Sequence, residues 1–73
     1  MFPLESLRSG ETGRVVDVDG QLDLVQRLQE LGLRLGATVQ MLRSGSPLLI
    51  AIDGQRLSFR PDQRAMVLVE PAV

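Results

Sequence analysis

The sequence contains no cysteine and no histidine, and lysine, tryptophan and tyrosine are also missing. These absences remove the disulfide, the thiol nucleophile, and the usual ligands of structural zinc and haem. We therefore expect no metal site and no cofactor. A chain of 73 residues has room for one domain, spanning residues 1–73. Its stability must come from its apolar side chains, which are 44% of the chain, or from a partner.

Neither sign of charge predominates. Eight arginines face nine acidic residues, for a formal net charge of −1, and there is no basic tail. RNA binding normally needs a basic surface and stacking aromatic side chains, whereas Phe2 and Phe59 are the only aromatic residues. We therefore expect no nucleic-acid partner.

No long hydrophobic run is present. The longest one, residues 48–52, is far shorter than the roughly 18 residues of a membrane span. The first residues lack the basic segment and apolar stretch of a signal peptide. With methionine at position 1, we expect a complete small cytoplasmic protein that is not embedded in the membrane.

The residues needed for catalysis do not occur together. No histidine or lysine is available to activate a serine or threonine. Asp17 and Asp19 are interpreted as solvated carboxylates and not as an acid–base pair. A calcium loop counted from Asp17 has Leu22 and Leu28 where glycine and glutamate are required. We expect no enzymatic activity.

Short segments between glycines predict a β-rich domain. Alternating apolar residues predict strands at 14–18, 38–43, 48–52, 55–59 and 66–70. Single helical turns are predicted separately, at 3–8 and 61–64. In the first strand, Arg14, Val16 and Val18 are expected on one face, opposite Val15 and Asp17.

The dipeptide Asp53-Gly54 predicts a two-residue hairpin turn. Such a turn places Ile52 opposite Gln55, and the pairing continues along both strands. One face is then entirely apolar; it consists of Leu48, Ile50, Ile52, Leu57 and Phe59.

Residues 23–31 change to a helical period, because Leu24, Leu28 and Leu31 recur at i, i+4 and i+7. Asp23 is the expected N-cap, with Gln26 three residues later as in a capping box.

The expected end of this helix is marked by Gly32, at a position where a left-handed conformation costs glycine little. Leu33 would then contact Leu28, as in a Schellman motif. Glycines are also expected to form structural turns elsewhere, at Gly10, Gly13, Gly36 and Gly54.

These elements define the fold class: mainly β with one helix, as a small five-stranded SH3-like barrel whose helix is inserted between the first and second strands. One helix cannot cover an open sheet of this size, so closure into a barrel is the economical arrangement. An OB barrel has its helix between the third and fourth strands, which does not fit this order.

Two resemblances bear on function. Residues 13–20, GRVVDVDG, resemble the KOW-type pattern of small barrels in transcription and ribosomal proteins, which leaves an RNA- or ribosome-associated barrel as an alternative. Over residues 4–70 the chain is similar to the FeoA family. The resemblance is carried by Gly10-x-x-Gly13-x-Val15-Val16, by RLQELGLRLG at 27–36, and by LSFR at 57–60.

The FeoA resemblance implies an SH3-like barrel and a non-catalytic accessory protein of bacterial ferrous iron transport. Its implied partner is the membrane ferrous iron transporter with a cytosolic GTPase domain, at the inner face of the membrane, with a homo-oligomer as a further arrangement. A similar domain ends iron-dependent repressors, which gives a third alternative. The short SGSP segment at 44–47 departs from family members that have a longer loop there.

The partner surface is expected at the edge between the helix and the following strand. Leucines beyond the helix end, if exposed, would form an apolar patch of the kind that binds proteins. The predicted partner-binding residues are Leu22, Leu24, Arg27, Leu33, Arg34 and Leu35.

Overall fold

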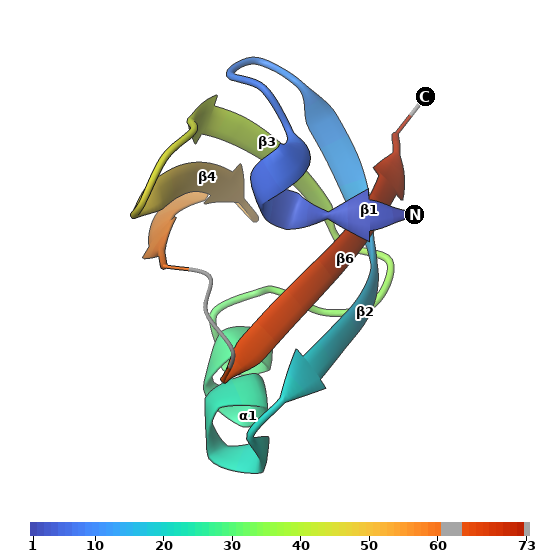
Figure 1. Ribbon diagram of the computed structural model, residues 1–73, viewed down its shortest axis with the longest axis vertical. Helices are drawn as coiled ribbons and strands as arrows, with labels where there is room; N and C mark the ends of the chain where they lie inside the picture. Colours follow the sequence, from blue (N-terminus) through green and yellow to red (C-terminus); the bar gives the residue numbers. More distant parts are fainter. Residues whose placement is uncertain (61–63, 73) are drawn as a thin grey trace.

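The fold is a strongly curved antiparallel sheet with one α-helix at its end (Figure 1). It is seen in a computed structural model, which describes residues 1–60 and 64–72. The elements are β1 (Phe2–Pro3), the 3₁₀ turn η1 (Leu4–Ser6), β2 (Thr12–Gly20), α1 (Leu22–Glu30), β3 (Thr38–Arg43), β4 (Leu48–Ile52), β5 (Gln55–Phe59) and β6 (Ala65–Pro71). The strands lie in the order β1-β6-β2-β3-β4-β5.

This order agrees with the predicted mainly β barrel, with α1 between the first two long strands, β2 and β3. The structure adds a sixth strand, because β1 pairs with Val69 and Leu68 of β6. A strand of two residues has no alternation that a sequence pattern can detect. Of the turn predicted at 61–64, residues 61–63 lie outside the described residues.

The glycines predicted to form turns do not all lie in turns. Gly10, Gly36 and Gly54 do, but Gly13 is a buried residue of β2. A Cβ at position 13 would lie 3.2 Å from the Cβ of Val69 and 3.3 Å from Cδ1 of Leu7. The prediction of a turn at Gly13 was therefore wrong: the residue lies in a strand, where the side chains of Val69 and Leu7 occupy the space that a larger residue would need.

A β-bulge in β2 changes the predicted faces of that strand. Val15 pairs with Val69 and Asp17 with Leu68, so Val16 is the extra residue without a partner. As a result Val15 and Val18 face the core together, opposite Val69 and Val67, although they are three residues apart. The expectation that Val18 shares a face with Arg14 and Val16 was wrong for this reason.

The hairpin of β4 and β5 has the predicted register. Ile52 pairs with Gln55, Ile50 with Leu57 and Leu48 with Phe59. Asp53 adopts φ 52° at the first turn position, as a two-residue turn of this type requires. The apolar face predicted from this register is confirmed, with Leu57 half-buried and the other four side chains buried.

Helix α1 begins two residues earlier than the predicted cap implies, because its N-cap is Gln21, not Asp23. Gln21 has extended geometry (φ −63°, ψ 135°), and its N–H donates to the carbonyl oxygen of Arg64 at 2.8 Å. The helix thus starts directly where the ladder of β2 and β6 ends. Asp23 lies within the first turn, and no side chain caps the helix.

The end of α1 has the expected geometry. The N–H of Gly32 donates to the carbonyl of Gln29 at 3.1 Å, and the N–H of Leu33 donates to the carbonyl of Leu28 at 2.9 Å. These two bonds define a Schellman motif, and Gly32 has the positive φ of 113° that the motif needs. The chain therefore leaves the helix toward the barrel interior.

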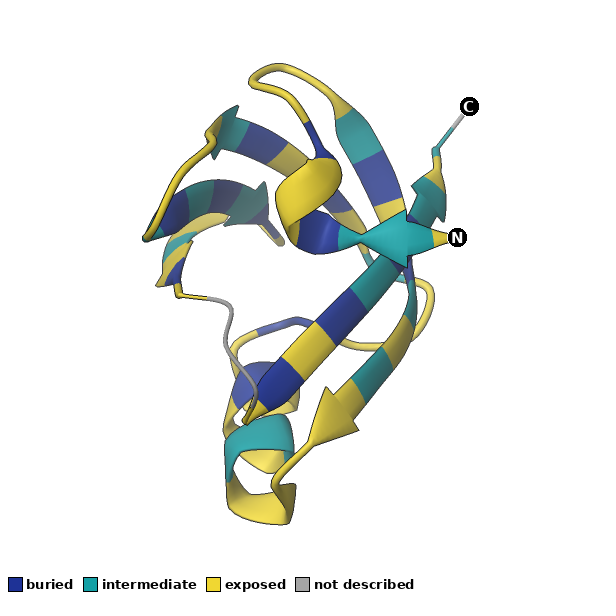
Figure 2. Cartoon of the chain, viewed as in Figure 1, coloured by how far each residue is buried: buried dark blue, intermediate teal, exposed yellow. Residues whose placement is uncertain are grey.

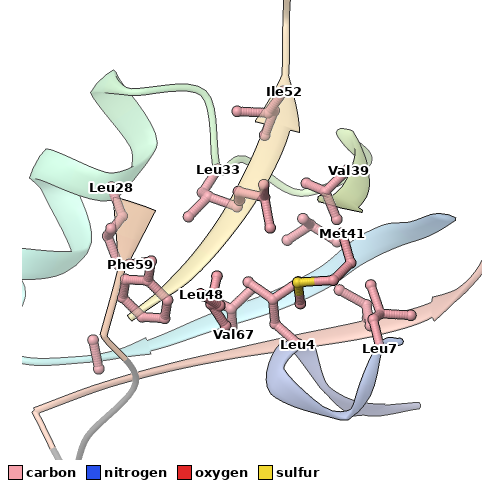
Figure 3. Close-up of a cluster of buried hydrophobic side chains, with 14 residues drawn as sticks. Leu4, Leu7, Leu28, Leu33, Val39, Met41, Leu48, Ile52, Phe59 and Val67 are labelled. Atoms are coloured by element: carbon pink, nitrogen blue, oxygen red, sulfur yellow. The ribbon is translucent and has the colours of Figure 1, made fainter. Parts of the chain in front are cut away.

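The core lies between the curled sheet, η1 and the inner side of α1 (Figures 2 and 3). Its side chains are all hydrophobic, and the described residues contribute no buried polar or charged side chain. The buried residues are Leu4, Leu7, Val15, Leu28, Leu33, Val39, Met41, Leu48, Ile50, Ile52, Phe59, Ala65, Val67 and Val69.

Candidate protein-binding surface

Large hydrophobic side chains are exposed at both ends of α1. Leu22, at the start of the helix, is 73% exposed. At the other end, Leu31 is 41% exposed and Leu35 is 66% exposed. Each is a side chain that could enter a partner's surface without disturbing the core.

The leucines predicted to bind a partner do not lie together on one exposed surface. Leu33 is completely buried in the core, so its proposed role in a partner contact was wrong. The Schellman motif is the reason, because it turns the residue after Gly32 inward. Leu24 is half-buried and packs against the core.

Leu22 lies too far away to share a patch with the leucines beyond the helix. Nine residues separate it from Leu31, which is about two and a half turns at about 3.6 residues per turn. The two side chains therefore lie at opposite ends and on opposite sides of α1. The predicted surface divides into a lone Leu22 and a group at the helix exit.

Leu35 is held on a short, well-anchored turn. The N–H of Ala37 donates to the carbonyl of Arg34 at 3.0 Å, which closes the turn around Leu35 and Gly36. The turn is tied to β2, because Gly36 donates to the carbonyl of Val15 at 2.7 Å and Val15 donates to the carbonyl of Ala37 at 2.8 Å. Leucine is unusual at an exposed turn, where small and polar residues prevail.

Two arginines border the same helix end. Nε of Arg34 donates to the carbonyl oxygen of Gln29 at 3.0 Å, which caps the end of α1 with a positive charge. Arg27 is exposed and lies one helical turn before Leu31, on the same side of the helix. We name the group formed by Arg27, Leu31, Arg34 and Leu35 the α1 exit surface.

Leu31 is the member of this surface that sequence reasoning missed, because its spacing placed it in the buried stripe of the helix. It is the C-cap residue, and the chain has already begun to leave the helix there. A signal was present in the sequence: Leu31 directly precedes Gly32, the residue predicted to end the helix, so it lies where the buried face of the helix stops.

A shallow polar hollow of about 390 Å³ lies beside the α1 exit surface, on the solvent side of α1. It is lined by Gln26, Gln29, Glu30 and Arg34. Its amide groups and its two oppositely charged side chains can hydrogen-bond a polar chain segment at the margin of an interface.

Within the described part of the chain, no group of three or more Asp or Glu residues is placed to hold a metal ion. No helix in residues 1–60 and 64–72 is long and apolar enough to cross a membrane.

This architecture and surface define a class: a small SH3-like β-barrel that displays leucines and arginines at one helix end. The family follows from comparison with known proteins. A model of the FeoA domain matches residues 2–71, and the chain belongs to the FeoA family. The resemblance noted from its sequence motifs is thereby confirmed.

Individual relatives agree with this assignment. The chain is 26% identical over 73 residues to a protein of Methanocaldococcus jannaschii with the provisional name Fe(2+) transport protein A, covering 99% of this chain and 89% of that protein. A crystal structure of a FeoA described as an iron uptake regulatory protein is 33% identical, with a TM-score of 0.78, and covers 93% of this chain and 96% of the other.

The FeoA of Stenotrophomonas maltophilia, solved as a complex with zinc, is 27% identical to this chain. It has a TM-score of 0.80, and the match covers 96% of this chain and 91% of that one. That protein is described as a prokaryotic SH3 domain protein and a candidate ferrous iron transport activating factor. The SH3-like fold predicted for this chain is therefore confirmed.

Proposed function

We propose that this protein is a non-catalytic, cytoplasmic accessory protein of ferrous iron transport. It binds the cytosolic GTPase domain of the membrane iron transporter through the α1 exit surface. Membership of the FeoA family and the iron-transport names of its relatives support the process. The absence of histidine and cysteine supports a role through protein contact, since a tight iron site normally uses those ligands.

The observation that carries this proposal is the exposed Leu35 on its anchored turn. Because three hydrogen bonds fix the backbone of this turn, binding through Leu35 requires no ordering of the loop that carries it. Leu31, 41% exposed at the end of α1, adds a second exposed apolar side chain, and protein interfaces commonly surround apolar side chains with a polar rim.

The arginines specify the expected chemistry of the partner. Arg34 is already oriented by its bond to the Gln29 carbonyl, and Arg27 borders the leucines on the helix side. A partner surface with a hydrophobic pocket and carboxylates at its margin would complement both features.

The direct test measures binding of the purified protein to the isolated cytosolic domain of the transporter from the same organism by isothermal titration calorimetry. Leu35→Asp and Leu31→Asp are expected to weaken binding at least about tenfold, because a carboxylate would have to be buried against an apolar pocket. Leu22→Asp is the matched control for Leu35→Asp, since it makes the same change at a similarly exposed leucine at the opposite end of α1.

Each variant must first give a circular dichroism spectrum and a thermal midpoint close to those of the wild type. Wild-type affinity in Leu35→Asp, or equal losses in Leu35→Asp and Leu22→Asp, would refute the α1 exit surface as the contact. A change in oligomeric state of Leu35→Asp in sedimentation would instead assign the surface to a second copy of the chain.

Ferrous iron uptake by cells lacking the gene tests the process separately. Complementation with the wild type and with Leu22→Asp should restore uptake, whereas Leu35→Asp should not. Normal uptake in cells without the gene would contradict the accessory role itself, whatever surface is involved.

A further inference from the structure

Strand β5 ends the sheet and has a free edge. The strand order places β4 on one side of β5, and no strand among residues 1–60 and 64–72 pairs with its other side. Figure 1 shows β5 at the outer end of the curved sheet, next to β4. An unpaired edge is a template for another extended segment.

The register of the hairpin determines which backbone groups are available at this edge. In a two-residue hairpin, the residues flanking the turn, Ile52 and Gln55, form a hydrogen-bonded pair. Hydrogen-bonded and non-bonded pairs alternate along the ladder, so Arg56 and Ser58 occupy non-bonded positions. Their N–H and C=O groups therefore point away from β4, toward the free edge.

The side chains along β5 differ on its two faces. Arg56 and Ser58 are exposed on the outer face, while Leu57 is half-buried on the inner face. Arg43 lies on the same outer face, two strands away, through its pairing with Leu49. Strands β3, β4 and β5 contain these two arginines and no carboxylate.

This charge disfavours a second copy of the chain as the added strand. Pairing of two β5 edges around Arg56 and Ser58 would bring the guanidinium groups of both copies close together on one face. Like charges on neighbouring strands are destabilising, whereas a carboxylate opposite an arginine is favourable. The occupant that this edge favours is therefore an acidic segment.

We propose that the free edge of β5 binds an extended acidic segment of a partner protein as an additional strand. Acidic side chains of the segment lie beside Arg56 on the outer face, and alternate apolar side chains pack beside Leu57. Its backbone bonds to the N–H and C=O groups of Arg56 and Ser58. This surface shares no residue with the α1 exit surface, and the proposal does not depend on the proposed function.

A synthetic peptide of alternating glutamate and valine, blocked at both ends, is the probe. Amide hydrogen exchange followed by NMR is the measurement. With the peptide present, the amides of Arg56 and Ser58 should exchange at least about tenfold more slowly, because they become hydrogen-bonded. The amide of Leu57, already bonded to β4, should change little. A peptide of alternating lysine and valine should give no such protection.

Two variants examine the backbone and charge contributions separately. Ser58→Pro removes the outward N–H, a change tolerated at an edge strand, and should abolish binding; Ser58→Ala keeps the N–H and should bind as the wild type. Arg56→Glu should prefer the lysine–valine peptide, which keeps the charge test available if Ser58→Pro fails to fold. Leu35→Asp should bind the acidic peptide normally.

The proposal would be overturned by no protection at millimolar peptide, by protection centred on α1 in place of β5, or by equal binding of both peptides to the wild type. Concentration-dependent protection of β5 without any peptide would assign the edge to a second copy of the chain and would also overturn it.

Discussion

The N–H of Leu33 donates a hydrogen bond to the carbonyl oxygen of Leu28 at 2.9 Å, and both side chains are buried in the same hydrophobic core. The bond closes the helix, and the inward turn that follows brings Leu33 into the barrel (Figure 3). The leucines of the 27–36 segment therefore have two different roles. Leu28 and Leu33 hold the helix against the barrel, whereas Leu31 and Leu35 remain available to a partner.

Leu33→Ala should lower the free energy of unfolding by about 3 kcal/mol, because it leaves a cavity in a closely packed core. Leu35→Ala, which removes the same atoms from an exposed turn, should change it by less than about 0.5 kcal/mol. Urea unfolding followed by circular dichroism measures both values. Similar losses in the two variants would show that Leu33 is not a core residue.

Gly20 and Gly32 differ in what surrounds them, although both have positive φ angles of 141° and 113°. A Cβ at position 20 would overlap the carbonyl oxygen of Arg64 and lie 2.7 Å from Cα of Ala65, whereas at position 32 the nearest atom is 3.5 Å away. Gly32→Ala should cost about 1–2 kcal/mol from its backbone conformation alone.

Gly20→Ala should cost roughly twice as much, because β2 and β6 must also separate. Thermal unfolding of the two variants side by side gives the ranking. A smaller loss for Gly20→Ala than for Gly32→Ala would contradict the close approach of the two strands.

The sequence predicted correctly those features that are set by interactions between residues close together in the chain. The pairing of Ile50 with Leu57 was predictable, because a two-residue turn fixes the register of its hairpin. The end of α1 at Gly32 was predictable for the same reason, since its signals lie within six residues.

Features that depend on distant segments were not predictable. The helix N-terminus is set by the bond from Gln21 to Arg64, more than forty residues away, and not by the local capping preference of Asp23. The burial of Leu33 and the exposure of Leu35 could not be told apart from the sequence, because that required knowing which leucine the barrel buries.

Gln21→Asp should stabilise the protein by about 1 kcal/mol, because aspartate can accept a hydrogen bond from the first turn of α1 where glutamine makes none. Gln21→Ala is the matched control and should leave stability within about 0.5 kcal/mol of the wild type. The difference between the two midpoints in urea reports the cap. No gain in Gln21→Asp would indicate that the N-cap is not at position 21.

The bulge at Val16 makes a prediction about deletions in β2. Removing Val16 leaves Val15 opposite Val69, Asp17 opposite Leu68 and Val18 opposite Val67, as they already are. We therefore expect this deletion to keep the fold, at a cost of about 1–2 kcal/mol for the altered bend of the strand.

Removing Val18 instead shortens the strand by the same single residue, but it moves Val16 opposite Leu68, so that the bulge is lost and Asp17 takes the place of Val18. Asp17 would then stand opposite the buried Val67 at the half-buried position of Val18, next to the core, and we expect the partial desolvation of an unpaired carboxylate there to unfold the protein. Amide NMR spectra of the two deletion variants should show dispersed peaks for the first and collapsed peaks for the second. A folded Val18 deletion with an unfolded Val16 deletion would place the extra residue of β2 elsewhere.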